Sequence, residues 1–219
     1  MIRLAMIACL VLGLGAAEAR AHPHVFIDSG LQMHFDDEGR LAAVRVVWVY
    51  DAFYSMLLLE ELGLDPDFTG ELTEAEKAQL SGFDMQWVEG FEGDLYALQE
   101  GKPLRLSGPR DWTADVQDGR IITTHVRAFE DRPGVAQDPL VIQVYDPTYY
   151  TAYRIVIDPQ IEGRADCTAR IFEPDRTAAS EMLEAALAEM LAEPDFDEYE
   201  DFPAVGAAFS DEIRLTCAE

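Results

Sequence analysis

Basic side chains are scarce in this 219-residue sequence, which has 16 Lys and Arg against 42 Asp and Glu and a formal net charge of −26. Such a surface repels nucleic acid and anionic lipid head groups and concentrates cations near itself. The sequence therefore predicts no nucleic-acid partner. The simpler explanation of the charge, a soluble exported protein with an acidic surface, leaves the ligand open.

Cysteine is also scarce, with only Cys9, Cys167 and Cys217 in the chain. The last two lie in separate strand-like runs without the close spacing of zinc ligands, which disfavours a thiolate metal site. In an oxidising compartment this pair is predicted to form one disulfide, closing a loop of about 50 residues. Cys9 is a poor lipidation site, because almost no apolar sequence precedes it.

The apolar run at the start of the chain is too short to be a comfortable membrane span. It extends from Leu4 to Ala17, whereas a spanning helix needs about 20 residues. With Arg3 before it and small residues at positions 19 and 21 after it, the run has the three parts of a secretory signal peptide. We predict that residues 1–21 are removed and that residues 22–219 form a single periplasmic domain without lipid insertion.

The rest of the sequence is rich in strand patterns. Alternating apolar and polar residues from Val25 to Asp36, a turn, and a second run at Leu41–Tyr50 predict a β-hairpin. Further strands are expected at 94–98, 104–107, 120–129, 140–145, 150–157, 168–172 and 213–216, helices at 52–62 and 177–192, and a solvated acidic loop at 193–201. The fold class is therefore α+β: a β-sandwich-like antiparallel body with an EF-hand-like helical insertion at about residues 52–82 and one helix in the C-terminal half.

Cleavage after Ala21 would leave His22 as the first residue of the mature chain. Its α-amine and imidazole can both bind a metal ion at neutral pH, and His24 adds a second imidazole. Pro23 has no backbone N–H, so a site built from successive deprotonated amides cannot form through it. The pattern predicts a brace for Zn²⁺, Cu²⁺ or Ni²⁺. The alternative is that both histidines are merely exposed at a chain end.

Two residues far along the chain are candidates for completing this metal site. His125 lies mid-strand and can face either the amino terminus or the core, where a lone strand histidine is usually structural. Asp146 ends a strand before Pro147, so it is either available to a metal or a turn former. His34 lies too far along the first strand to reach His24 and is expected at the surface.

Residues 65–76 match a twelve-residue EF-hand calcium loop. The predicted ligands are Asp65, Asp67, Thr69, the Glu71 carbonyl oxygen and a bidentate Glu76. With three side-chain carboxylates and no paired loop, we expect weak, structural calcium binding. The alternative is a capping box from Thr73 to Glu76, which would not explain Asp65 or the glycine at position 70.

Several segments together resemble a known bacterial exported family of unknown function. They are His22-Pro23-His24-Val25-Phe26, Trp48–Ser55, the calcium-like loop, Gly82-Phe83-Asp84 and Val144–Tyr150. Members of that family are often labelled the periplasmic component of an uncharacterised ABC-type transport system and tend to be encoded near nickel, cobalt or zinc transporters. The resemblance implies a metal-handling role, with His22, His24 and Asp146 as ligands.

The predicted function is a periplasmic, non-enzymatic transition-metal-binding accessory protein that serves an inner-membrane transporter of nickel, cobalt, zinc or copper. Two alternatives belong to other classes. One is a copper-dependent redox enzyme that uses the same brace, against which stands the lack of a recognisable substrate platform. The other is a structural module stabilised by calcium alone.

Overall fold

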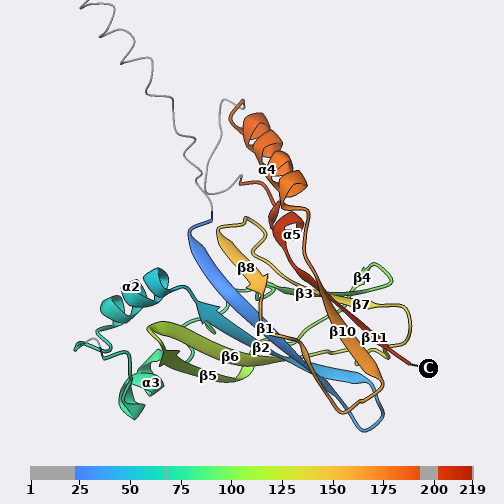
Figure 1. Cartoon of the computed structure of the whole chain (residues 1–219), viewed down its shortest axis with the longest axis horizontal. Helices are drawn as coiled ribbons and strands as arrows, with labels where there is room; N and C mark the ends of the chain where they lie inside the picture. Colours follow the sequence, from blue (N-terminus) through green and yellow to red (C-terminus); the bar gives the residue numbers. More distant parts are fainter. Residues whose placement is uncertain (1–22, 68, 193–201, 219) are drawn as a thin grey trace, which may run out of the picture.

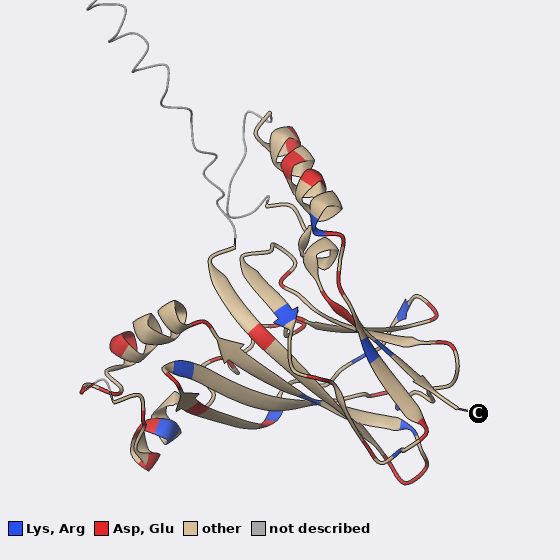
Figure 2. Cartoon of the chain, viewed as in Figure 1, with Lys and Arg blue, Asp and Glu red and all other residues tan. Residues whose placement is uncertain are grey.

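The structure is a computed structural model that describes residues 23–67, 69–192 and 202–218. The predicted signal peptide, His22 and the acidic run 193–201 lie outside the described residues. The fold is α+β with a β-rich body of two sheets, as predicted (Figure 1). No helix in the described part of the chain is long and apolar enough to cross a membrane. Acidic residues are spread over several elements (Figure 2).

The first sheet contains the predicted hairpin. Its strands have the order β5-β6-β2-β1-β8, and β9 also pairs with β1. Their bounds are β1 Val25–Phe35, β2 Leu41–Tyr50, β5 Arg110–Gln117, β6 Arg120–Ala128, β8 Thr151–Ile155 and β9 Gln160–Glu162. Pairing is antiparallel except that β1 runs parallel to both β8 and β9. The body is therefore not antiparallel throughout, because residues from the C-terminal half return to the free edge of β1.

The second sheet has the order β10-β11-β7-β3-β4 and is antiparallel. Its strands are β3 Leu95–Gln99, β4 Lys102–Pro103, β7 Leu140–Val144, β10 Cys167–Phe172 and β11 Glu212–Cys217. Cys167 and Cys217 are register partners at one end of β10 and β11 and form the predicted disulfide. The bridge therefore fastens β10, the last strand on that side, to its neighbour.

One hydrophobic core is shared by the two sheets. Leu31 and Met33 of β1 are buried in it with Ile142 of β7 and Leu215 of β11. The alternation of the first strand is confirmed from Leu31 to Phe35, where the apolar side chains are buried while Gln32 and His34 between them are partly exposed. Burying one face of each sheet against the other is what stabilises this arrangement.

The prediction of a strand at 104–107 is wrong. The structure has only β4 before it and an isolated bridge between Leu106 and Phe129. The backbone N–H of Leu104 donates to Ala97 in the second sheet, whereas that of Ser107 donates to Ala128 in the first. This segment crosses from one sheet to the other, so it cannot continue a ladder in either.

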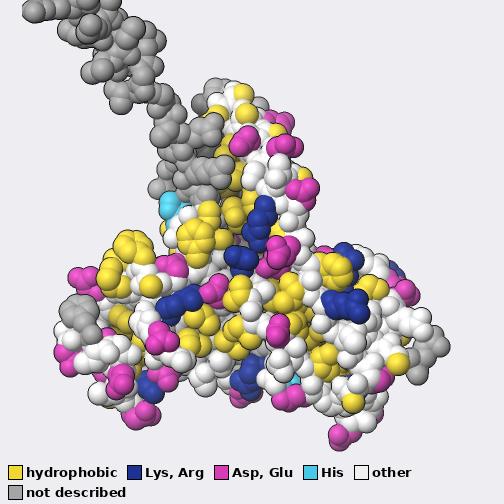
Figure 3. Space-filling view, viewed as in Figure 1, with side chains coloured by type: hydrophobic (Ala, Val, Ile, Leu, Met, Phe, Trp, Pro, Cys, Tyr) yellow, Lys and Arg dark blue, Asp and Glu magenta, His cyan; other side chains and the backbone are white. Residues whose placement is uncertain are grey.

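The described helices are α2 Ala52–Leu62, α3 Glu74–Leu80, α4 Arg176–Met190 and α5 Gly206–Phe209. α2 follows β2 directly, because the side chain of Asp51 caps it by accepting a hydrogen bond from the backbone N–H of Tyr54 over 2.9 Å. It ends at Gly63, whose φ of 67° is the left-handed conformation that glycine adopts without strain. Hydrophobic side chains gather on its exposed side, among them Phe53 and Met56 (Figure 3).

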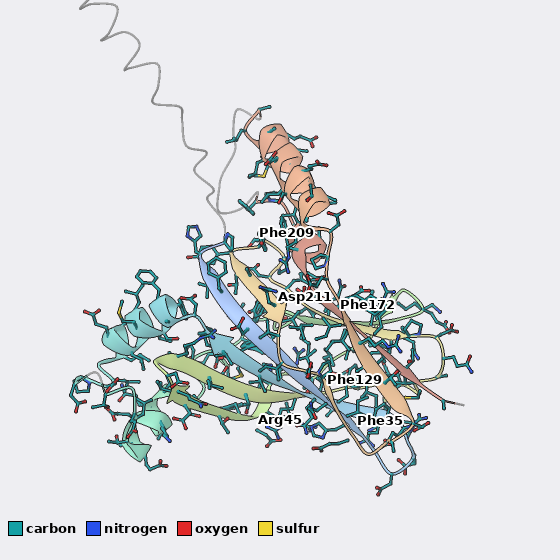
Figure 4. The ribbon with its side chains drawn as sticks, viewed as in Figure 1. Phe35, Arg45, Phe129, Phe172, Phe209 and Asp211 are labelled. Carbon is teal, nitrogen blue, oxygen red and sulfur yellow. A yellow bond between two sulfur atoms is a disulfide. The ribbon has the colours of Figure 1, made fainter. Side chains whose placement is uncertain are left out.

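α4 projects away from the sheets (Figure 1), and its base is fixed by α5 and by Asp211, the residue before β11. Phe209 stacks on Tyr149 with 3.9 Å between ring centroids. The buried carboxylate of Asp211 accepts a hydrogen bond from the backbone N–H of Ile155 over 2.8 Å and lies 3.3 Å from the Arg176 guanidinium (Figure 4). These contacts join the start of α4 to the end of β8.

Candidate functional site

His24, one of the first described residues, is held at the rim of a pocket. Its backbone N–H donates a hydrogen bond to the carbonyl oxygen of Tyr150 over 2.8 Å, and the two ring centroids lie 4.8 Å apart. Asp51 holds the second residue of β1 by accepting a hydrogen bond from the backbone N–H of Phe26 over 2.9 Å. The exposed His24 side chain lines the pocket.

The pocket has a volume of about 620 Å³ and lies where the ends of β1, β2 and β8 meet α2 and the segment after α3. That size suits a small organic molecule. Half of its described lining residues are Phe, Tyr or Trp, and none of them is Lys or Arg. They are His24, Val25, Ile27, Trp48, Tyr50, Phe53, Tyr54, Leu57, Asp84, Phe91, Asp94, Tyr150, Thr151 and Tyr153.

Asp94, directly before β3, is one of two acids in the pocket wall and is buried. Its residue is 8% exposed, and its Oδ2 accepts a hydrogen bond from the hydroxyl of Tyr153 over 2.8 Å. Its Oδ1 is buried without a hydrogen-bond partner among the described residues. Burial raises the pKa of Asp94 to about 7, and the nearby carboxylate of Asp146 adds to the rise while the Tyr153 hydrogen bond opposes it.

Asp84, four residues after α3, is the second acid in the pocket wall and is partly buried. Its Oδ2 accepts hydrogen bonds from the hydroxyls of Tyr50 over 2.9 Å and Thr123 over 2.8 Å. As in Asp94, the Oδ1 atom is buried and has no partner among the described residues. Burial raises the pKa of this carboxyl, and the two hydroxyl hydrogen bonds oppose the rise.

The segment that joins these two acids is fixed by Trp87. The Trp87 Nε1–H donates to the carbonyl oxygen of Asp84 over 2.8 Å, and the Arg127 guanidinium lies 4.7 Å from the ring centroid. Gly93 has a φ of 66°, and a Cβ there would lie 2.2 Å from the Trp87 ring. A side chain at Gly93 would therefore displace the tryptophan. Because both ends of the segment are fixed, both acids are positioned by the fold.

His125, a predicted metal ligand, lies in the core and is not among the residues that line the pocket. Its ring is 4.8 Å from that of Trp48 and 5.6 Å from that of Trp87, between centroids. Burial, with a smaller contribution from the Arg127 charge, lowers its pKa to about 3, so the imidazole is neutral. Of the two orientations that the sequence allowed, the structure has the one toward the core.

Asp146, the other predicted ligand, has the hydrogen bonds of a turn former. Its Oδ1 accepts from the backbone N–H and the hydroxyl of Thr148, both over 2.8 Å, and its Oδ2 accepts from the backbone N–H of Thr151 over 2.9 Å. In the part of the chain that the structure describes, no three His, Cys, Asp or Glu side chains are grouped so that they could hold a metal ion. A site at the amino terminus therefore depends on His22.

The predicted calcium loop joins α2 to α3 and is closed by its own hydrogen bonds. Asp65 accepts from the backbone N–H groups of Thr69 over 2.8 Å and Gly70 over 2.9 Å, which lowers the pKa of its carboxyl. Glu76 accepts from the backbone N–H groups of Asp65 over 3.1 Å and Thr73 over 2.8 Å. The capping box is thus present. Asp67 and Glu71 are exposed in the same loop, and calcium binding stays a prediction.

Residues 7–217 match the model of a family described as a protein of unknown function, DUF1007. The chain belongs to this family. A search of curated proteins found no significant match. Membership of DUF1007 agrees with the predicted resemblance to a family of unknown function, and it assigns no ligand.

Two site residues of this DUF1007 chain, Asp84 and Asp94, were not predicted as functional from the sequence. Asp84 falls within a segment that carries the family resemblance, and Asp94 is the first residue of the strand predicted at 94–98, which begins one residue later in the structure. Neither belongs to a spacing motif. Their partners, Tyr50 and Tyr153, are distant in the sequence, so only the folded chain brings each acid to its tyrosine.

Proposed function

We propose that the protein is a periplasmic transition-metal-binding accessory protein that serves an inner-membrane metal transporter. The observation that supports this most directly is the position of His24. It is held at the pocket rim one residue before β1 begins. A chain cleaved after Ala21 would carry the His22 amine and imidazole two residues from that rim.

The residues around the pocket are suited to a cation. The His22 amine, the His22 ring and the His24 ring would hold Zn²⁺, Cu²⁺ or Ni²⁺. The unpartnered Oδ1 atoms of Asp84 and Asp94 favour positive charge nearby, because a buried carboxylate oxygen without a hydrogen bond is costly. The net charge of −26 raises the local concentration of cations as well.

An accessory protein that delivers an ion must also release it, and an incomplete ligand set favours exchange. The family resemblance to a periplasmic component of an ABC-type transport system supports the same role. In this proposal calcium binds weakly between α2 and α3 and stabilises that part of the structure only.

The test compares the mature chain beginning at His22 with a chain carrying one additional alanine before it. Calorimetric titration with Zn²⁺, Cu²⁺ and Ni²⁺ should show at least tenfold weaker binding to the extended chain, about 1.4 kcal/mol. His24→Ala should weaken binding similarly. The control is His34→Ala, since His34 lies further along β1 and its Nδ1 is 2.8 Å from Glu162. Equal affinity of the mature and extended chains would refute the amine as a ligand.

A second measurement separates delivery from catalysis. The accessory role predicts that chelator dialysis strips the ion and that no reductant is oxidised in repeated turnovers. Copper that survives dialysis and supports turnover would replace the transport proposal by the copper-enzyme alternative.

A further inference from the structure

The interior of the pocket has a composition that differs from that of a metal site. Seven of its lining residues have Phe, Tyr or Trp rings, and its acids, Asp84 and Asp94, belong to the wall beyond the exposed His24 rim. A metal ion needs several nitrogen, oxygen or sulfur ligands close together, and the described residues do not provide three. Aromatic faces instead attract organic cations, because the ring quadrupole is negative above its plane.

In each of the two acids, one carboxylate oxygen accepts a hydrogen bond from a tyrosine and the other has no partner among the described residues. Tyr153 donates to Oδ2 of Asp94, and Tyr50 donates to Oδ2 of Asp84. The two Oδ1 atoms accept no hydrogen bond from any described residue. A buried acceptor without a donor is costly for the fold. A ligand that carries N–H donors and a positive charge would remove that cost. The described lining residues include no Lys or Arg that could do so.

We propose that this pocket binds a small organic ammonium ion, a primary amine with an apolar or aromatic body. The ammonium group donates a hydrogen bond to the unpartnered oxygen of Asp94, with Asp84 as the second acidic wall. The apolar body packs among the rings, of which Trp48 and Tyr153 belong to the strands and Phe53 to α2. This activity goes beyond the transition-metal role and needs neither His22 nor a metal.

The chemistry of the walls sets the selectivity. A neutral alcohol of the same shape keeps the apolar contacts but lacks the charge, and a carboxylate of the same shape meets two acids. A quaternary ammonium keeps the attraction to the rings but has no N–H to donate to Asp94. Primary amines should therefore bind more tightly than all three analogues.

The test measures binding of 2-phenylethylamine and hexylamine to the mature protein by calorimetry. The matched comparison ligands are 2-phenylethanol, 3-phenylpropionate and trimethyl(2-phenylethyl)ammonium. We expect saturable binding of the amines and at least tenfold weaker binding of each comparison ligand. This series needs no protein variant, so its outcome does not depend on whether a substituted chain folds. Failure of both amines to bind at millimolar concentration, or equal binding of 2-phenylethylamine and 2-phenylethanol, would overturn the proposal.

Variants then locate the site. Asp94→Asn should weaken amine binding at least tenfold, whereas Asp118→Asn should leave it unchanged. Asp118 is exposed in the turn between β5 and β6, and its substitution removes the same charge. Equal weakening by both substitutions would indicate a general charge effect and refute the site. One additional residue before His22 should leave amine binding intact even where it abolishes metal binding, so the two proposals fail separately.

Discussion

The buried carboxyl of Asp94 should make the folded protein less stable as the pH rises. Its pKa is raised from 3.8 to about 7. Between these values the folded chain holds a proton that the unfolded chain has lost, so unfolding releases a proton. The free energy of unfolding should then fall by about 1.4 kcal/mol for each pH unit across that window, a loss of about 4 kcal/mol by pH 7.

The substitution that isolates this effect is Asp94→Asn. Asparagine can still accept the Tyr153 hydrogen bond, and it tolerates the φ of 51° at this position. It also puts a buried amide donor without a partner in the pocket wall, at a cost of about 1–3 kcal/mol. The net expectation is a gain in stability of about 1–3 kcal/mol at pH 8, which reverses to a loss of about 1–3 kcal/mol as the pH approaches 4 because only the cost of the amide remains.

Urea unfolding measured at intervals from pH 4 to pH 8.5 would show the difference. Asp118→Asn is again the control, because it removes an exposed carboxylate of the same charge. The reasoning is refuted if the two variants give parallel stability curves, or if the advantage of Asp94→Asn grows toward acid pH. Asp84 also has a raised pKa and is still present in the Asp94→Asn variant. The stability of that variant should therefore keep part of the pH dependence seen in the wild type.

Three further outcomes are expected. Replacing Cys167 and Cys217 together by serine removes a bridge with a sequence separation of 50, and should lower the free energy of unfolding by about 4 kcal/mol on the chain-entropy model. Reductant in a urea titration should then destabilise only the wild type. Gly206→Ala would put a Cβ 1.7 Å from a carbonyl oxygen and should cost at least about 2 kcal/mol, whereas Gly108→Ala, with nothing within 4 Å, should be tolerated in the same titration. Millimolar calcium should raise the melting temperature of the wild type but not of Glu76→Gln; an unchanged wild-type melting curve would leave that carboxylate with its capping role alone.

Most elements were predictable because their signals are local. The alternation of β1 and β2 records one buried and one exposed face, and the caps at Asp51 and Asp175 mark where helices begin. The parallel pairing of β1 with β8 was not predictable, since alternation within a strand does not name its neighbour. The error at 104–107 has a related cause, because its hydrogen bonds divide between two sheets.

The candidate site was less predictable than the fold. Among 42 acidic residues nothing local distinguishes Asp84 and Asp94, and their burial depends on strands far away in the sequence. His24 could be singled out because it lies only three residues after Ala21, the predicted cleavage site. The orientation of His125 could not, because a strand residue faces the core or solvent according to how the sheets pack.

The position of β1 in its sheet has a consequence for how the chain folds. β1 ends at Phe35, and the strand that covers its second edge begins only at Thr151. When the chain is synthesised or exported from its amino terminus, that edge can recruit other chains until more than half of the protein has followed. Parallel pairing over such a long separation is also slow. A partner that shields the edge of β1 during this interval would therefore raise the yield of folded protein without changing its final stability.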